Sequence, residues 1–166
     1  MRRAETLGVT ILRGKEHLPV LNELLTDTMK RSAMAYPGLK RLNELYDSFN
    51  AQVEIAIAVH EGKPQGGIFI PWNLYGAYYL YGGSSDSPTI GAMNHLHWHT
   101  MLTMKARGVK IYDFFGARIH PISGSKQEGI QRFKKRFGAS MKSGLLWKYP
   151  INSLKYNLLI YLRKFK

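Results

Sequence analysis

The sequence predicts one layered α/β domain of the α+β type, in which helices pack against a β-sheet. Three observations predict this class. Two segments with helical spacing of apolar residues come first, a series of strands follows, and a strand–helix–strand crossover comes next. The chain has 166 residues, of which 45% are hydrophobic, and this is enough for one domain with a hydrophobic core.

The two expected helices lie in the first third of the chain. Residues 9–12 form either a short first strand or the remnant of a linker. Residues 15–34 place leucines and Met29 at helical spacing, which predicts a helix. Pro37 opens a second helix, in which apolar residues recur at the same spacing as far as Phe49.

Three strands are expected after these helices, at residues 53–59, 67–72 and 77–81, where the period of the pattern changes. Residues 61–64 have the composition of a turn, and residues 82–85 end the last strand. The connections are short, so we expect an antiparallel meander.

The second half predicts a crossover. Pro88 starts a helix that Gly108 stops, and residues 109–115 form a strand. We therefore expect the segment from about residue 77 to residue 115 to be a parallel, right-handed strand–helix–strand unit. The remaining expected elements are a loop at 116–125, a helix at 126–137, a strand at 140–149 and a helix at 151–166.

The charge of the chain is unevenly distributed. Residues 1–86 hold nine basic and nine acidic residues, whereas residues 87–166 hold fifteen Lys and Arg against only Asp113 and Glu128. The formal net charge of +13 therefore comes from the second half. Such a surface favours polyanions: nucleic acid, diphosphate-linked precursors or an acidic membrane face.

Composition also bears on location. The chain has no cysteine, which excludes disulfides and cysteine-type zinc sites. We find neither an apolar run of the roughly 18 to 20 residues that span a bilayer nor a secretory signal. A cytoplasmic location, with the inner face of the membrane as a further option, is the expectation.

Three blocks of sequence resemble the Fem family of peptidoglycan-bridge aminoacyltransferases and related FemAB-like domains. The first block is Tyr79 to Ser84, before the expected helix, and the second is Ala106 to Gly116. The third, Gly129 to Gly138, has the form G-I-x-x-F-K-x-x-F-G and is the most specific. The resemblance implies a GNAT-like acyl-CoA N-acyltransferase fold, a twisted mixed sheet with helices on both faces.

The resemblance also implies partners. Fem proteins usually contain two such domains and transfer an amino acid from aminoacyl-tRNA to an amine on a peptidoglycan precursor. This chain is long enough for one domain, so a partner domain or a homodimer is implied. It lacks the glycine-rich loop with which acetyl-CoA enzymes hold pyrophosphate, so no cofactor is expected.

The short helix at 126–137 supplies the main candidate site residues. Ile130, Phe133 and Phe137 form its apolar stripe, and Lys126 and Lys134 lie beside that stripe, toward the body of the protein. In the resembling family the Phe–Lys pair lies at the substrate cleft. Lys134 is therefore a candidate for contact with a phosphate or with the negative charge of acyl transfer, with Lys126 and Phe133 as substrate-binding neighbours. A structural lysine that extends to solvent is the alternative.

Other candidates come from the strand ends. Asp113 lies in an apolar run, where a partly buried carboxylate would accept a proton from the attacking amine or hydrogen bonds from a loop. Tyr81, Gly83 and Ser84 end a strand and either bind substrate or form a turn before a helix. Two arginines are candidate phosphate contacts or surface charges: Arg31 and Arg118.

His95, His97 and His99 suggest a metal site, but the sequence argues against one. On a helix His95 and His99 share the polar face, whereas His97 lies among apolar residues, so all three cannot bind one ion. No cysteine and few nearby carboxylates are available as further ligands. We therefore expect no metal, and His97 is interpreted as a core histidine with one hydrogen-bonded nitrogen.

The end of the chain predicts a separate element. We expect residues 1–150 to form the domain and residues 151–166 to form a basic amphipathic C-terminal helix. That helix would dock on the domain, dock on a neighbouring domain or make a peripheral contact with an anionic membrane.

Three functions follow from these residues and from the resemblance. One is a Fem-like transferase that forms an amide on a cell-envelope precursor with aminoacyl-tRNA as the donor. Another is an N-acyltransferase that acts on an envelope sugar with a thioester donor. The third is a non-catalytic module that binds tRNA, a lipid-linked precursor or a partner.

Overall fold

The computed structural model describes residues 2–50, 52–117, 120–145 and 147–163. The chain divides into two compact units, Met1–Pro121 and Ile122–Lys166. The first unit contains both sheets. The second contains two helices.

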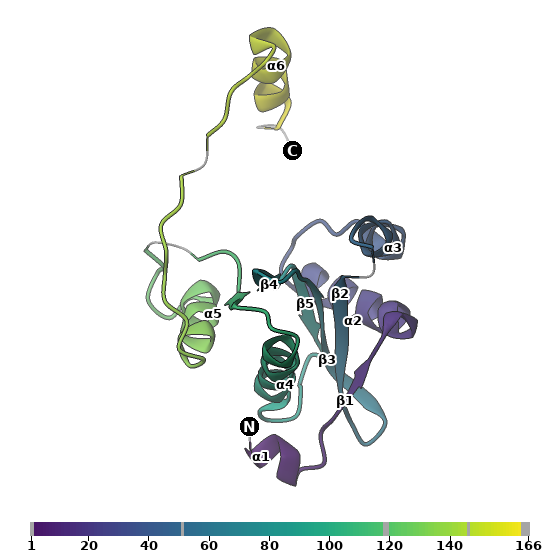
Figure 1. Cartoon of the computed structure of the whole chain (residues 1–166). Helices are drawn as coiled ribbons and strands as arrows, with labels where there is room; N and C mark the ends of the chain where they lie inside the picture. The colour runs from purple at the N-terminus through teal and green to yellow at the C-terminus, as the bar shows by residue number, and fades with distance from the viewer. Residues whose placement is uncertain (1, 51, 118–119, 146, 164–166) are drawn as a thin grey trace. The chain divides into compact units, whose positions relative to one another are not determined.

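A four-stranded antiparallel sheet is the centre of the first unit, in the order β1-β2-β3-β5 (Figure 1). Its strands are β1 (Thr10–Arg13), β2 (Val53–His60), β3 (Lys63–Pro71) and β5 (Tyr81–Ser84). The register of β2 on β3 pairs Ile55 with Phe69, and β3 in turn pairs Phe69 with Tyr81. The short first strand and the antiparallel pair of the first two predicted meander strands are confirmed, but the third predicted strand does not join this sheet as predicted.

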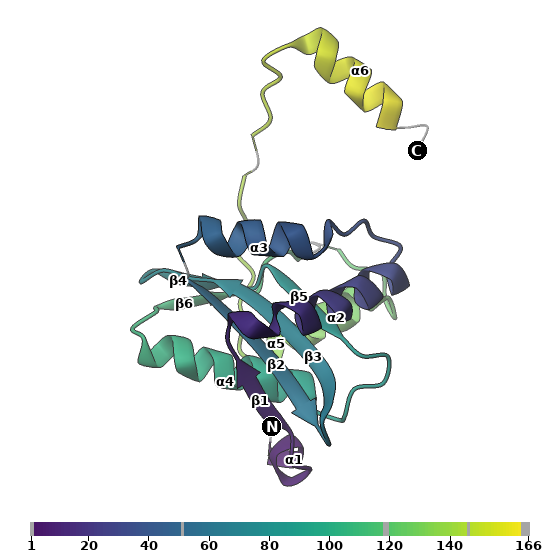
Figure 2. The ribbon, with the colours of Figure 1, turned by 90° about the vertical axis from the view of Figure 1, so that its right-hand side faces the viewer.

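Helices cover both faces of this sheet, as Figure 2 shows. On one face, α2 (Leu18–Arg31) and α3 (Gly38–Ser48) pack with Ile55, Ile57 and Phe69. On the other, α1 (Arg2–Thr6) and α4 (Ala92–Ala106) belong to a second core with alternate residues of β2 and β3, which are Ala56, Ala58, Ile68 and Ile70. Because successive side chains of a strand point to opposite faces, one continuous apolar run fills two cores. The expected layered fold is confirmed.

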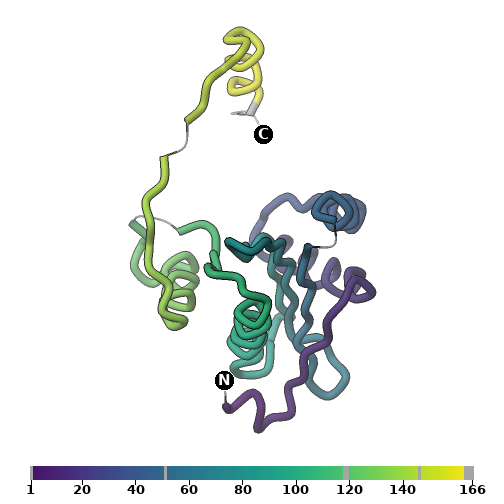
Figure 3. Tube along the Cα trace, viewed as in Figure 1, coloured from purple at the N-terminus to yellow at the C-terminus, as the bar shows by residue number. Residues whose placement is uncertain are grey.

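The crossover connects the two strands of a second sheet. In it β4 (Gly76–Tyr78) pairs in parallel with β6 (Ile111–Asp113), and α4 lies between them in sequence (Figure 3). Parallel strands require such a long connection, so the predicted parallel unit is confirmed.

The strand predicted at residues 77–81 is instead divided between the two sheets. The backbone N–H of Tyr79 donates to the Asp113 carbonyl at 2.8 Å, whereas the next N–H, of Leu80, donates to the Phe69 carbonyl at 3.2 Å. The chain therefore leaves the β4–β6 sheet at Tyr79 and enters the four-stranded sheet at Tyr81. Residues 82–84, predicted as the end of a strand, are most of β5.

Two other boundaries differ from the sequence prediction. The α4 helix begins at Ala92 rather than at Pro88, after Gly91, whose φ of 83° is left-handed. The β6 strand stops at Asp113 because Phe115 and Gly116 have φ values of 48° and 51°, which a strand cannot contain.

The second unit contains α5 (Lys126–Lys135) and α6 (Ser153–Arg163), both within predicted helices. The predicted strand at 140–149 is wrong, since the described residues of that range have no regular structure and almost all are exposed. A strand needs a partner, and the described part of this unit offers none. The predicted domain boundary at residue 150 stays a prediction.

Candidate functional site

The point where the chain changes sheets is held by an aromatic cluster, in which His97 and Phe114 are buried and Tyr79 and Tyr112 are partly buried. The ring of Tyr79 meets the ring of His97 edge to face at 4.6 Å and that of Phe114 at 6.3 Å. His97 is fully buried, and its Nδ1 shares a hydrogen bond of 2.9 Å with the Tyr112 hydroxyl. The interpretation of His97 as a core histidine with a hydrogen-bonded nitrogen is confirmed.

Burial keeps the phenols of this cluster neutral. It raises the pKa of Tyr79 to about 12. Burial, with a smaller contribution from Tyr79, also raises the pKa of Tyr112 well above its ordinary value. Neither phenol is therefore a base at neutral pH, and the cluster fixes the backbone between β4 and β5 by packing.

The residues predicted to bind substrate at β5 lie together, against α2. A side chain added at Gly83 would place its Cβ 2.5 Å from the Leu24 carbonyl oxygen, so this glycine permits close packing of α2 on the sheet. The N–H of Ser84 donates to the Thr28 hydroxyl at 2.9 Å. Tyr81 meets Phe69 edge to face at 6.3 Å. The contacts of Tyr81, Gly83 and Ser84 thus account for β5 as a packed strand, and their binding role stays a prediction.

Arg31 extends this network at the end of α2. Its Nη1 donates to Asp86 Oδ1 at 2.5 Å, and its Nη2 donates to the Thr28 hydroxyl at 3.0 Å and to the Ser84 carbonyl at 2.5 Å. A phosphate would have to compete with the Asp86 carboxylate for this guanidinium. Arg118, the other predicted phosphate contact, lies outside the described residues.

A groove of about 310 Å³ lies beside this network, between α2 and the loop after β5. Its lining includes three carboxylates, those of Glu23, Asp27 and Asp86, so it attracts amines rather than phosphates. This groove was not predicted from the sequence. The only available signal was the placement of Glu23 and Asp27 four residues apart, on one helix face.

Asp113 differs from the expectation. It is the last residue of β6 and is exposed, so the prediction of a partly buried carboxylate is wrong. Its Oδ1 accepts a hydrogen bond of 2.7 Å from the backbone N–H of Phe115. This contact holds the turn in which Phe115 has a positive φ. A catalytic role for Asp113 stays a prediction.

The α5 helix of the second unit carries the remaining candidates. Ser125 caps it by accepting from the Glu128 N–H at 3.3 Å, and Glu128 Oε2 accepts from the Gly124 N–H at 2.8 Å. This reciprocal arrangement fixes where the helix begins and so which side chains share a face.

The exposure of the α5 side chains agrees with the prediction in part. Phe133 and Lys134 are half-buried, and the rings of Phe133 and Phe137 lie 5.2 Å apart. Lys126 and Ile130 are exposed, and the expectation that Lys126 faces the body of the protein stays a prediction. The cations predicted to face solvent are exposed, namely Arg132, Lys135 and Arg136. Lys134 is therefore the half-buried cation of this helix.

The α6 helix exposes both charge and apolar surface. Leu154, Leu158 and Leu162 are 85%, 59% and 59% exposed. Within the described residues, no helix is both long and apolar enough to span a bilayer.

Comparison with known structures defines the class of fold. FemX has a TM-score of 0.70 at 19% identity over 82% of this chain, which spans 52% of the FemX chain. The aminoglycoside acetyltransferase meta-AAC0020, from an uncultured soil metagenomic sample and in complex with sisomicin, has a TM-score of 0.66 at 16% identity. In that pair 90% of this chain and 99% of the other are covered. A putative acetyl transferase from Pyrococcus furiosus has a TM-score of 0.61 at 19% identity, covering 86% and 99% of the two chains. The fold is of the GNAT acyltransferase type.

Sequence comparison then gives the family. The FemAB family model matches residues 65–164, which is more than half of the chain. The chain therefore belongs to the FemAB family, as the three blocks indicated. No curated protein sequence matches it. The chain spans about half the length of FemX.

Proposed function

We propose that this chain is an acyl-transferring domain that forms an amide on a peptidoglycan or other cell-envelope precursor, with aminoacyl-tRNA as the donor. Membership of the FemAB family supports the proposal. The observation that carries it further is the charge of the second unit, which has eleven lysines and arginines and one acidic residue, Glu128. This surface suits both proposed substrates, because tRNA and diphosphate-linked precursors are polyanions.

The proposed reaction is acyl transfer from an ester to an amine. The precursor amine attacks the ester carbonyl carbon of the donor, a C–N bond forms, and the carbonyl oxygen becomes negative. The ester C–O bond then breaks, the tRNA hydroxyl takes up a proton, and the amine nitrogen loses one. Asp113, or a group on a substrate, is the proposed acceptor of that proton.

Lys134 has the proposed role of contacting either a substrate phosphate or the negative oxygen. A fixed cation accelerates the reaction only if it stabilises the transition state more than the bound substrate. Half-burial suits this role, since a partly desolvated ammonium interacts more strongly with an anion than an exposed one does. Lys135, the next residue, is exposed and offers a matched control.

The test is a transfer assay with the full chain, charged tRNA and a nucleotide-linked or lipid-linked muropeptide, with the product detected by mass spectrometry. We expect the precursor to gain the mass of one aminoacyl residue. Lys134→Ala should lower kcat/KM about 100-fold, as loss of a transition-state contact does, and Lys135→Ala should change it less than about threefold. Equal turnover by the wild type and Lys134→Ala would remove Lys134 from the mechanism.

A second candidate is an N-acyltransferase with a thioester donor. It is favoured by two acetyltransferase structures that this chain covers to 99% of their length, whereas it covers half of FemX. Replacing charged tRNA by acetyl-CoA in the same assay separates the two, because only one donor should give product.

The exposed apolar surface of α6 supports a proposal about partners. Leu154 and Leu158 are 85% and 59% exposed beside basic residues, so a second Fem-type domain, a second copy or an anionic membrane would cover them. Salt-dependent tRNA binding with no product from either donor would favour the binding module instead of an enzyme.

A further inference from the structure

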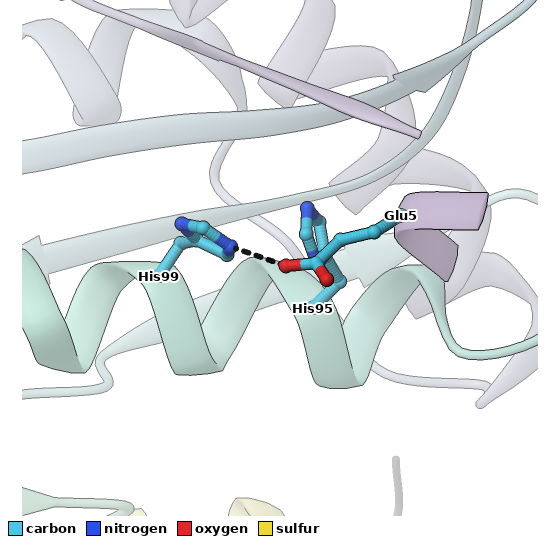
Figure 4. Close-up of side chains that lie close together, drawn as sticks. All are labelled: Glu5, His95 and His99. Carbon is cyan, nitrogen blue, oxygen red and sulfur yellow. Dashed lines mark hydrogen bonds and ion pairs between the residues drawn. The ribbon is translucent and has the colours of Figure 1, made fainter. Parts of the chain in front are cut away.

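Three side chains from two distant parts of the sequence meet where α1 packs against α4. Glu5 comes from α1, and His95 and His99 come from successive turns of α4 (Figure 4). Glu5 Oε1 lies 3.4 Å from His99 Nε2 and 3.8 Å from His95 Nδ1. One nitrogen or oxygen of each residue lies within 4.8 Å of those of the other two.

The packing of α1 on α4 places Glu5 there. Ala4 is fully buried, and a Cβ added at Gly91 would lie 3.5 Å from the Ala4 Cβ. Ala4 also belongs to the same core as Ala92, at the start of α4. The carboxylate next to Ala4 is thereby presented to the histidine pair. No local pattern in the sequence predicts this contact, because Glu5 lies ninety residues before His95.

The state of His95 points to a ligand. It is 4% exposed, and its Nδ1 has no hydrogen-bond partner among the described residues, although a buried polar atom ordinarily has one. This nitrogen lies 3.8 Å from the Glu5 carboxylate oxygen, beyond hydrogen-bond distance.

We propose that Glu5, His95 and His99 bind one first-row divalent cation of the zinc class, and that this ion fastens α1 to α4. Two imidazoles at positions i and i+4 of a helix with one carboxylate are a donor set that such ions prefer over Mg²⁺ or Ca²⁺. Tetrahedral bonds of about 2.0–2.1 Å place ligand atoms roughly 3.3 Å apart, so rotation of the exposed Glu5 and His99 side chains brings the three atoms into range.

The remaining coordination position faces solvent. Glu5 and His99 are 53% and 37% exposed, which leaves room for water as a fourth ligand. This proposal does not depend on acyl transfer. Its alternative is a simple ion pair between Glu5 and a protonated histidine, which would have no preference for metal.

The experiment uses the full chain without an affinity tag, freed of metal by chelator and dialysis. Zn²⁺ is titrated by calorimetry, and bound metal is counted by mass spectrometry. We expect one equivalent of Zn²⁺, a rise in Tm on binding, and the intense visible bands of tetrahedral cobalt when Co²⁺ replaces Zn²⁺.

Single variants test the ligands. Glu5→Gln and His99→Asn should each weaken Zn²⁺ binding at least about tenfold, with circular dichroism unchanged because both side chains are partly exposed. The matched control is His17→Asn, since His17 Nε2 lies 3.8 Å from Glu16 Oε1 and the described residues add no third ligand to this pair. This variant should bind Zn²⁺ as the wild type does. Absence of Zn²⁺ binding by the wild type, or wild-type affinity in His99→Asn, would overturn the proposal.

Discussion

The two units of this chain use similar apolar residues in opposite ways. In the first, residues 53–58 of β2 are all buried, and the strand contributes to a core on each face of the sheet. In the second, none of the described residues is buried, and α6 exposes leucines at successive turns. The first unit thus contains its own hydrophobic cores, whereas the second displays surface that a core would normally cover.

Charge follows the same division. Residues 1–121 hold thirteen basic and ten acidic residues, whereas residues 122–166 hold eleven and one. Nearly equal numbers of acidic and basic residues around two hydrophobic cores suit a stable scaffold. A basic surface with exposed apolar residues suits recognition of a large anionic substrate. We propose that the first unit is the scaffold and that the second binds the anionic substrate.

The largest expected contrast is between two leucines. Leu21 is fully buried in α2, and Leu158 in α6 is 59% exposed. Leu21→Ala should lower the free energy of unfolding by about 4 kcal/mol, since it removes buried methyl groups and leaves a cavity. Leu158→Ala should change it by less than about 0.5 kcal/mol. Urea unfolding measures both, and equal effects would contradict the division into scaffold and binding unit.

The second-largest loss of stability is expected on removal of a buried carboxylate in the first unit. Glu54 is 5% exposed and pairs with both Arg13 and Arg107, whose Nη1 lies 2.8 Å from Glu54 Oε2. Glu54→Ala leaves two guanidinium groups without their anion and should cost about 3 kcal/mol. The control is Glu44→Ala, which removes a more exposed pair with Arg41 and should cost under about 1 kcal/mol. Similar losses in thermal unfolding would show that burial of Glu54 is unimportant.

Two glycines sharpen the comparison further. Gly83→Ala forces a Cβ to 2.5 Å from the Leu24 carbonyl oxygen and should destabilise the first unit by roughly 2 kcal/mol. Gly129→Ala, within α5, meets no atom within 4 Å and should leave stability unchanged or raise it by up to about 1 kcal/mol. Chemical denaturation of both variants measures these changes in stability. A neutral Gly83→Ala would mean that α2 moves readily on β5.

The smallest expected effect is a loss of folding stability at alkaline pH, caused by the ionisation of Tyr79. Because the folded pKa of Tyr79 is raised to about 12 from its ordinary 10.0, the folded state favours the neutral phenol. The stability that this contributes is complete below pH 10 and is lost as pH rises toward 12, by roughly 1 kcal/mol at pH 11. Tyr79→Phe should therefore lose less stability between pH 9 and pH 11 than the wild type does, by about that amount. Identical slopes of stability against pH would show that Tyr79 is not buried as described.

The sequence predicted most of the first unit because its signals are local. The apolar alternation at 53–59, the turn at 61–64 and the long crossover each depend on neighbouring residues. The break at Tyr79 and Leu80 was missed because both residues suit a strand, and only their partners, Asp113 and Phe69, divide it. Secondary structure follows from local pattern, but sheet membership depends on distant residues.

The site residues were harder to predict for the same reason. Gly83 was placed in a substrate site, whereas its neighbour is the backbone of α2, which no local pattern reveals. Glu5 had no assigned role, since its partners His95 and His99 lie far along the chain. The strand expected at 140–149 had suitable residues, but the residues that the structure describes offer it no partner strand.

Hydrogen exchange of the full chain, with and without tRNA, tests the division between scaffold and binding unit most directly. We predict that tRNA slows amide exchange in α5 and α6, residues 126–135 and 153–163, and leaves β2 and β3 unchanged. The slowing should diminish as salt rises, because the contact is between cations and phosphates. Slowing confined to residues 2–117, or none at any salt concentration, would contradict the account.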